Sequence, residues 1–134
     1  MYLLDTNIWL ELLLAQSRAA EVRRFLENIY SHQLAMTDFT LYSIGIILTH
    51  LGRGAVFADF LADTVEVPGF VLIRLEAEEL RELVTAARQY QLGFDDAYQY
   101  VAARRRGCRL LSFDADFDRT DIARATPAEI VPPA

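Results

Sequence analysis

Acidic side chains recur where short apolar segments of this sequence end. Asp5, Asp38 and Asp114 each follow a run of apolar residues typical of a buried strand, while Asp96 and Asp116 lie in the stretches nearby. Carboxylates that converge on one place repel each other unless a cation neutralises them. Ligand sets made only of oxygen suit Mg²⁺ or Mn²⁺, which can activate water for attack on a phosphodiester. The five acids together therefore predict a divalent-metal site.

Each acid taken singly also has a structural interpretation. Asp5 and Asp38 could cap the helices that follow them, because aspartate is favoured at that position. Asp114 and the acids after it lie in a turn-like stretch, where aspartate forms local hydrogen bonds. Asp96 is harder to explain in this way, since Asp95 is the expected cap of the same helix. We therefore expect Asp96 to point across the strand ends.

Short apolar runs alternate with helical segments along the whole chain. The predicted strands cover residues 2–4, 33–37, 70–75 and 109–113, with a short fifth strand at 130–131. The predicted helices cover residues 8–18, 19–30, 39–51, 56–65, 76–91 and 95–106. Strands that are apolar throughout and separated by helices indicate a parallel sheet covered on both faces. We expect one domain, 1–134, with a three-layer α/β/α architecture and a central parallel sheet of four to five strands.

Composition narrows the classes of function. The net charge is −6, so the chain as a whole repels the phosphates of a nucleic acid. A nucleic acid would have to be bound through local arginines or through a bound cation. The run Arg104-Arg105-Arg106 could bind the phosphates of RNA, or it could complement the dipole at the C-terminal end of its helix. All 13 basic residues are arginine, which excludes mechanisms that need a lysine, such as Schiff-base catalysis.

The location and the partners of the chain are also predicted. The single cysteine, Cys108, the lack of a signal-peptide pattern and the lack of a long apolar run predict a soluble, cytoplasmic protein with no membrane association. The helices around Trp9 and across 39–51 are apolar almost all round. They are either buried within the chain or cover an interface with a second copy or another protein.

Three segments carry a resemblance to a known family, and they occur in the same order and spacing over essentially the whole chain. They are Leu4-Asp5-Thr6-Asn7-Ile8, Phe94-Asp95-Asp96-Ala97 followed by Ala102-Ala103, and Leu110-Leu111-Ser112-Phe113-Asp114-Ala115-Asp116-Phe117. The sequence resembles the PIN domains in these motifs. The resemblance implies a metal-dependent endoribonuclease, and for a small chain a VapC-type toxin of a type II toxin–antitoxin pair. It further implies RNA as substrate and an antitoxin as partner. The apolar helices around Trp9 and across 39–51 separately predict a homodimer.

The resemblance also implies roles for particular residues. Asp5, Asp96 and Asp114 would be ligands of Mg²⁺ or Mn²⁺. Asp116 would be a supporting catalytic acid, and Asn7 and Ser112 would orient the ligands.

One position departs from the family pattern. PIN domains normally carry a glutamate six residues after a serine or threonine that ends the second strand; counted from Thr37, Ser43 occupies that place. Asp38 is the only acid nearby, and we expect it to replace the glutamate in catalysis. The alternatives are a weakened metal site or a catalytically inactive scaffold that binds a protein or RNA.

Overall fold

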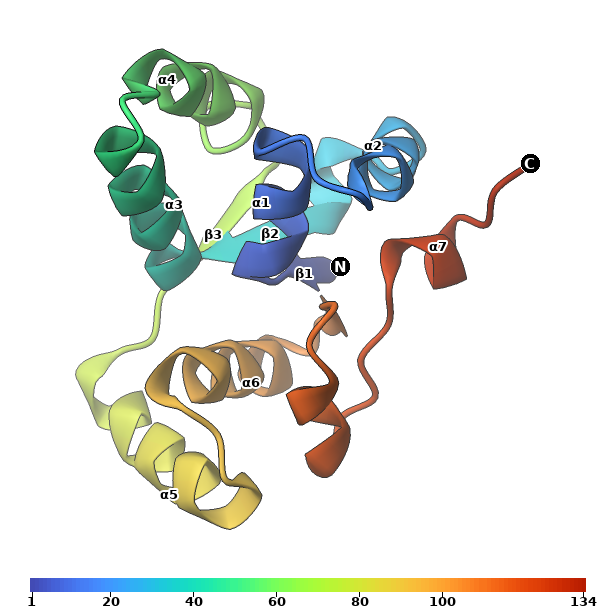
Figure 1. Ribbon diagram of the computed structural model, residues 1–134. Helices are drawn as coiled ribbons and strands as arrows, with labels where there is room; N and C mark the ends of the chain where they lie inside the picture. Colours follow the sequence, from blue (N-terminus) through green and yellow to red (C-terminus); the bar gives the residue numbers. More distant parts are fainter.

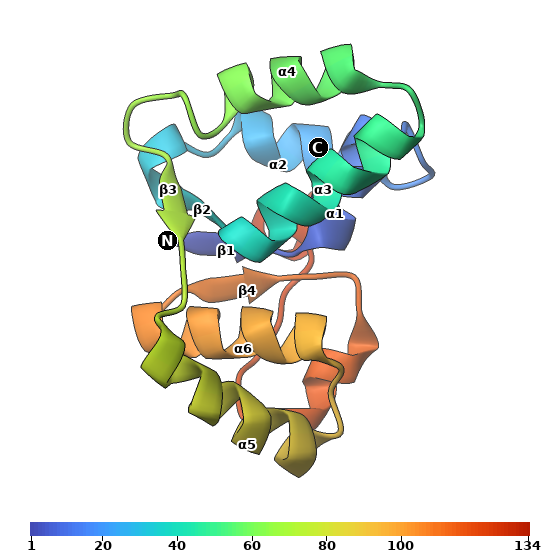
Figure 2. The same cartoon turned by 90° about the vertical axis from the view of Figure 1, so that its left-hand side faces the viewer.

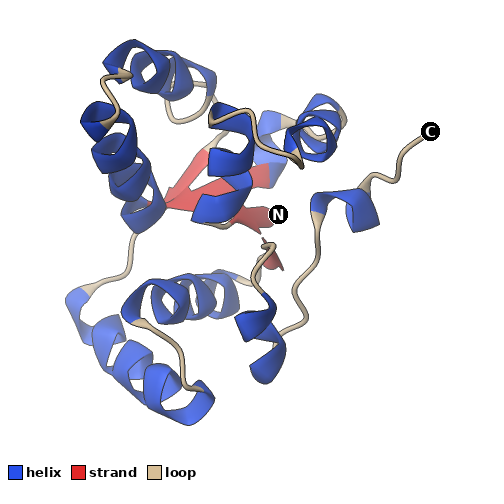
Figure 3. Cartoon of the chain, viewed as in Figure 1, coloured by secondary structure: helices blue, strands red, loops and turns tan.

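The computed structural model describes all 134 residues and shows a parallel sheet between two layers of helices (Figures 1 and 3). The strands are β1 (Tyr2–Leu4), β2 (Leu34–Thr37), β3 (Val71–Ile73) and β4 (Arg109–Leu111). They lie in the order β3-β2-β1-β4, and every neighbouring pair is parallel. In the register, Leu3 of β1 pairs with Ala35 on one side and with Leu110 on the other. The predicted three-layer α/β/α fold with four parallel strands is confirmed.

Helices cover both faces of this sheet. One layer contains α1 (Thr6–Leu13), α2 (Ala19–Glu27), α3 (Asp38–His50) and α4 (Gly54–Asp63). The other contains α5 (Leu80–Tyr90) and α6 (Phe94–Arg106), which lie on the opposite side of β4 and β1 in Figure 2. The remaining elements are the short helix α7 (Pro127–Ile130) and the 3₁₀ turns η1 (Ser31–Gln33), η2 (Ala77–Glu79) and η3 (Ala115–Arg119).

The two cores follow from the alternation of side chains along the strands. Leu3 is fully buried against the layer of α5 and α6. Leu4, the next residue, is fully buried against the layer of α1 to α4. Because successive strand residues point to opposite faces, a short strand of apolar residues can serve both cores. This explains why the strands are apolar throughout.

The structure corrects one detail of the prediction and decides between two alternatives for another. Residues 130–131 form no fifth strand, because Pro127 begins α7 and Glu129 accepts a hydrogen bond from the Thr126 amide at 3.3 Å, as in a capping box. The only extra pairing beside β4 is a single parallel bridge between Leu111 and Ala125. For the apolar helix expected at 39–51, of which both burial and an interface were possible, α3 is not buried on all sides, since 71% of the Ile46 surface is exposed.

No helix of the structure combines the length and the apolar character that crossing a membrane requires.

Candidate metal centre

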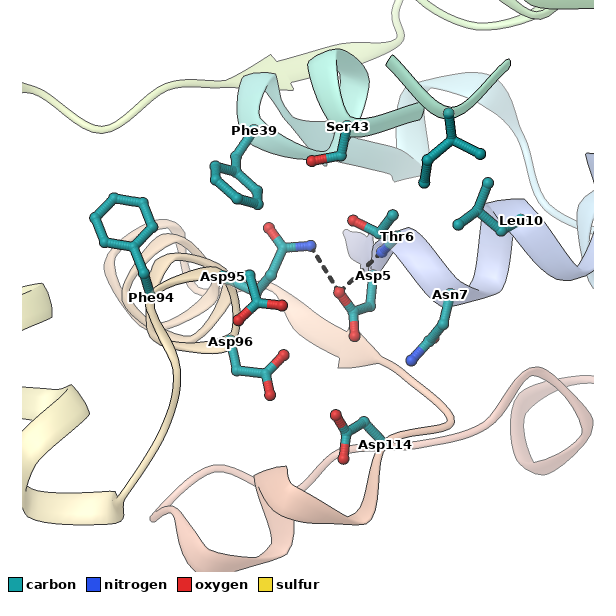
Figure 4. Close-up of a pocket in the computed structure, with 12 residues that line it drawn as sticks. Asp5, Thr6, Asn7, Leu10, Phe39, Ser43, Phe94, Asp95, Asp96 and Asp114 are labelled. Carbon is teal, nitrogen blue, oxygen red and sulfur yellow. Dashed lines mark hydrogen bonds between the residues drawn. The ribbon is translucent and has the colours of Figure 1, made fainter. Parts of the chain in front are cut away.

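The sheet order brings acids that are far apart in sequence to one place. Asp5 follows β1 directly, and Asp114 follows the adjacent strand β4 by three residues. Asp95 and Asp96 lie in the first turn of α6. These acids line one cavity of about 570 Å³, together with eight other residues: Thr6, Asn7, Leu10, Phe39, Ser43, Ile47, Phe94 and Gln99. Figure 4 shows the Asp5, Asp96 and Asp114 carboxylates turned toward a common space.

Asp5 is held by three hydrogen bonds although it is almost completely buried. Its Oδ1 accepts from the Thr6 amide at 2.8 Å and from Gln99 Nε2 at 3.0 Å, while Oδ2 accepts from Ser112 Oγ at 2.7 Å. Burial raises the pKa of Asp5, and the bonds from Gln99, Ser112 and Thr6 oppose that rise. Asp5 thus caps α1, as the structural interpretation expected, and also faces the cavity.

The closest group of carboxylates comes from α6 and the segment after β4. One oxygen each of Asp96, Asp114 and Asp116 lies within 4.8 Å of the others. Burial raises the pKa of Asp96 to about 7, and the charges of Asp95, Asp5 and Asp114 add to the effect. The raised pKa therefore reflects first the partial burial of the Asp96 carboxylate and second the repulsion from its acidic neighbours.

Asp5 lines the same cavity but lies outside that closest group of three. Asp116 is the exposed member of the group and has a cation beside it, since its Oδ1 lies 3.3 Å from Arg119 Nη1.

Ser112 connects Asp5 to the segment that carries Asp114. Its hydroxyl donates to Asp5 and accepts from the Asp114 amide at 3.0 Å. Asn7 Nδ2 donates to the same hydroxyl at 3.4 Å, and Asn7 Oδ1 accepts from the Phe113 amide at 3.3 Å. Asn7 and Ser112 are therefore placed where they can orient two of the acids.

Asp38 does not line the cavity, so the geometry does not support the expectation that it replaces the missing glutamate. Its Oδ1 accepts from the Tyr98 hydroxyl at 2.6 Å and from the Phe39 amide at 2.9 Å. Nor does it cap α3, because Thr37 holds that position and accepts from the Thr40 amide at 3.0 Å. Ser43, in contrast, lies on the cavity wall (Figure 4).

Several cavity residues were not expected from the sequence. Gln99 is 1% exposed and contacts Asp5. Phe39 and Phe94 form an aromatic wall, with ring centroids 5.8 Å apart. A polar residue inside the otherwise apolar inner face of a helix was the signal that could have drawn attention to Gln99.

The cap of α6 is Gly93 rather than the expected Asp95, which lies within the helix.

A family model for the PIN domain matches residues 2–123. The chain belongs to the PIN domain family. Members of this family are in general nucleases that use divalent metals. Among curated proteins, none matches this PIN domain by sequence.

Solved structures share the fold of this PIN domain over nearly the whole chain. A toxin–antitoxin complex from Klebsiella pneumoniae contains a chain that is 22% identical, with a TM-score of 0.73 and coverage of 95% of this chain and 98% of that one. VapC20 of Mycobacterium tuberculosis, a sarcin–ricin loop cleaving toxin, is 15% identical, with a TM-score of 0.80 and coverage of 95% and 100%. FitAcB from Neisseria gonorrhoeae is 20% identical, with a TM-score of 0.76 and coverage of 95% and 98%. Identities this low establish the fold alone.

Proposed function

We propose that this PIN domain is a divalent-metal-dependent endoribonuclease and the toxin of a type II toxin–antitoxin pair. The observation that carries the proposal is the acid cluster, in which oxygens of Asp96, Asp114 and Asp116 lie within 4.8 Å of each other beside the cavity that Asp5 also lines. Four carboxylates gathered at the edge where the strands of the sheet end would repel each other without a cation.

The residues present fit Mg²⁺ or Mn²⁺. The candidate ligands, Asp5, Asp96 and Asp114, offer only carboxylate oxygen, and neither histidine nor cysteine lines the cavity. When bound, such an ion supplies positive charge that activates water and neutralises a phosphodiester. The chain holds Asp5 through the Thr6, Gln99 and Ser112 bonds, and the Asp116 backbone amide donates to Asp114 Oδ1.

An RNA-cleavage assay tests this proposal. Purified protein is incubated with unstructured RNA and Mg²⁺ or Mn²⁺, with EDTA added in a parallel reaction and with Asp5→Asn as the matched variant. We expect cleavage only in the wild-type reaction with free metal. Cleavage that persists in EDTA would contradict the metal-dependent mechanism.

The alternative function, a PIN scaffold without catalysis, is favoured by one observation. Ser43 occupies the place of the usual glutamate on the cavity wall, and Asp38 is engaged by Tyr98 instead. The site therefore has one carboxylate fewer than the family pattern provides. Wild-type protein that binds Mn²⁺ and RNA without cleaving the RNA would support the scaffold.

Restoring the missing acid should strengthen metal binding. Because Ser43 already lines the cavity, Ser43→Glu should add a carboxylate and raise the Mn²⁺ affinity roughly tenfold, as ligand charge tunes affinity in such sites. Titration calorimetry measures the affinity. Ser43→Gln is the matched control, since it has the same size without the charge. Equal affinities of the two variants would show that Ser43 does not occupy the glutamate position.

An antitoxin partner is part of the proposal and is supported by a second cavity. This cavity measures about 380 Å³ and lies between α1, α2 and α4, with Leu13, Val56 and Phe60 among its lining residues. The buried indole N–H of Trp9, which lines it too, has no hydrogen-bond partner within the chain. Asp59 and Asp63 also line it, so its chemistry fits an amphipathic segment with basic residues. The solved Klebsiella pneumoniae relative is a toxin–antitoxin complex.

We also propose a homodimer, formed by the exposed face of α3 rather than by α1. Trp9 of α1 is only 2% exposed because it packs on Phe60, with ring centroids 5.3 Å apart. On α3, however, 63% of Tyr42 and 71% of Ile46 are exposed, and both line a shallow cavity with Phe57. Large apolar side chains exposed together are typical of interaction surfaces.

Changing the exposed face of α3 should separate the two copies. We expect the wild type to be a dimer at micromolar concentration and Ile46→Arg to be a monomer, because a charge would be buried in the interface. Light scattering coupled to gel filtration measures the mass. Val84→Arg is the control, since Val84 is 60% exposed on α5, in the other helical layer. A monomeric wild type, or a dimeric Ile46→Arg variant, would contradict the proposed interface.

A further inference from the structure

The Gln99 side chain is buried where α6 meets the ends of β1 and β2. Its Nε2 donates to Asp5 Oδ1 at 3.0 Å and to Thr40 Oγ1 at 2.8 Å. Its Oε1 accepts from Thr37 Oγ1 at 2.7 Å. Both N–H groups and the carbonyl therefore have partners, and one of these partners, Asp5, is an acid of the cavity. A buried amide with every group satisfied has one well-defined orientation.

The surrounding network determines which way the amide faces. The Thr37 hydroxyl accepts from the Thr40 amide at 3.0 Å, which leaves its own proton free to donate to Gln99 Oε1. The amide nitrogen must then face Asp5, whereas the flipped orientation would place the Gln99 oxygen against a carboxylate. The orientation of Gln99 is thus inferred from its partners on β2 and α3.

The same network continues to the cavity wall. Because Thr40 Oγ1 accepts from Gln99, the Thr40 hydroxyl proton is free to donate to Thr6 Oγ1, which lies 2.9 Å away. Thr6 lines the cavity next to Asp5. Four side chains from β2, α3, α6 and α1 are therefore joined in one polar chain: Thr37, Gln99, Thr40 and Thr6.

We propose that Gln99 is a positioning residue for the metal centre, which holds the Asp5 carboxylate in its ligating orientation. The proposal rests on the proposed metal-dependent function. Gln99 and Thr6 both donate to Oδ1, whereas Oδ2 accepts only from Ser112 and keeps a lone pair for a cation. Gln99 also lies one helical turn after Asp96, so its bond to Asp5 ties the position of Asp96 on α6 to the end of β1.

A purely structural role for Gln99 predicts a different result. In that case, removing the amide would lower the stability of the fold, because the Asp5 and Thr40 groups would lose a buried partner. It would not change the affinity of the folded protein for a metal. The two roles are therefore separated by measuring Mn²⁺ affinity and folding stability on the same variants.

The test uses Gln99→Met, which keeps the length of the side chain and removes its hydrogen bonds. Free Mn²⁺ is measured by electron paramagnetic resonance, and thermal unfolding is followed in parallel without metal. We expect roughly 10–100-fold weaker Mn²⁺ binding, the usual effect of losing a group that orients a ligand. The matched control is Thr64→Val, because Thr64 is buried, ends α4 in the other helical layer and donates to the Phe60 carbonyl at 2.7 Å. It should unfold earlier with unchanged Mn²⁺ affinity.

Two further measurements make the result decisive. In an Asp5→Asn background, Gln99→Met should have little additional effect on Mn²⁺ affinity, because the residue it positions is no longer a carboxylate. In metal-free wild type, the Gln99 side-chain amide protons should exchange slowly with solvent in NMR spectra, and Asp5→Ala should accelerate that exchange.

The possible negative results distinguish the role of Gln99 from the existence of the metal centre. Mn²⁺ affinity within twofold of wild type in Gln99→Met, or fast amide exchange in the wild type, would overturn the role of Gln99 while leaving the metal centre in place. Wild-type protein without saturable Mn²⁺ binding would overturn the proposed function and this inference with it.

Discussion

Asp114→Asn should reduce RNA cleavage by more than about 100-fold, because even changes outside the ligand set of a metal typically cost roughly 10–100-fold. Asp114, like Asp96, belongs both to the cavity and to the closest group of carboxylates. The asparagine keeps an oxygen that can accept from the Asp116 amide, as Asp114 Oδ1 does at 2.8 Å, so the turn at η3 should survive. The rate is measured on a fluorescent RNA under single-turnover conditions with saturating protein.

A nearby acid gives the control for that measurement. Asp118 lies in the same turn but outside the cavity, where its Oδ1 is 2.9 Å from Arg124 Nε. Asp118→Asn should cleave RNA at nearly the wild-type rate. Wild-type activity in Asp114→Asn, or equal losses in both variants, would show that the acid cluster is not the catalytic centre.

We also expect a large change in the free energy of unfolding with pH and with Mn²⁺. In the folded protein the pKa of Asp96 is raised to about 7, from an ordinary value of 3.8. Between these values the folded state binds a proton that the unfolded state has lost, so the free energy of unfolding decreases as pH rises. The metal-free protein should thus be less stable at pH 8 than at pH 4 on account of this group, and Asp96→Asn should flatten the dependence.

Mn²⁺ should reverse this loss at the higher pH. A ligand that binds only the folded state adds about 2.7 kcal/mol of stability when its free concentration is 100-fold above Kd. The gain should shrink below pH 7, because protons compete with the cation for Asp96. Thermal unfolding at pH 5, 6.5 and 8, with and without Mn²⁺, measures both effects.

Asp63→Asn is the control for the pH series, since Asp63 is an exposed residue at the end of α4. It should retain the wild-type dependence on pH and on Mn²⁺. An unfolding temperature that Mn²⁺ leaves unchanged at pH 8 would count against a metal centre formed by these acids.

Much of the fold could be predicted because the information was local. Apolar runs and the helices between them indicated four parallel strands, and the structure has them at nearly the same residues. The fifth strand at residues 130–131 was wrong because Pro127 and Thr126 favour a helix start at the place where the apolar residues suggested a strand. Here the capping residues decided the outcome.

The acids of the candidate site could be found for a similar reason. In a parallel sheet, residues that follow neighbouring strands share one edge, so Asp5 and Asp114 had to lie near each other once β1 and β4 were adjacent. The direction of a side chain on a helix was harder to predict. Asp38 and Ser43 are separated by roughly 500° of helical rotation. Only the packing of α3 shows that Ser43 faces the cavity and that Asp38 faces Tyr98.

The sequence by itself determined which chemical groups are available at the strand ends, because the strands and the acids after them are encoded within a few residues. The tertiary structure alone decided how those groups are held. Gln99 is 94 residues from Asp5 and 59 from Thr40, yet its amide bonds to both. Such a contact depends on how α6 packs against β1 and α3, and no local pattern specifies it, because helix packing is set by the fit of whole surfaces.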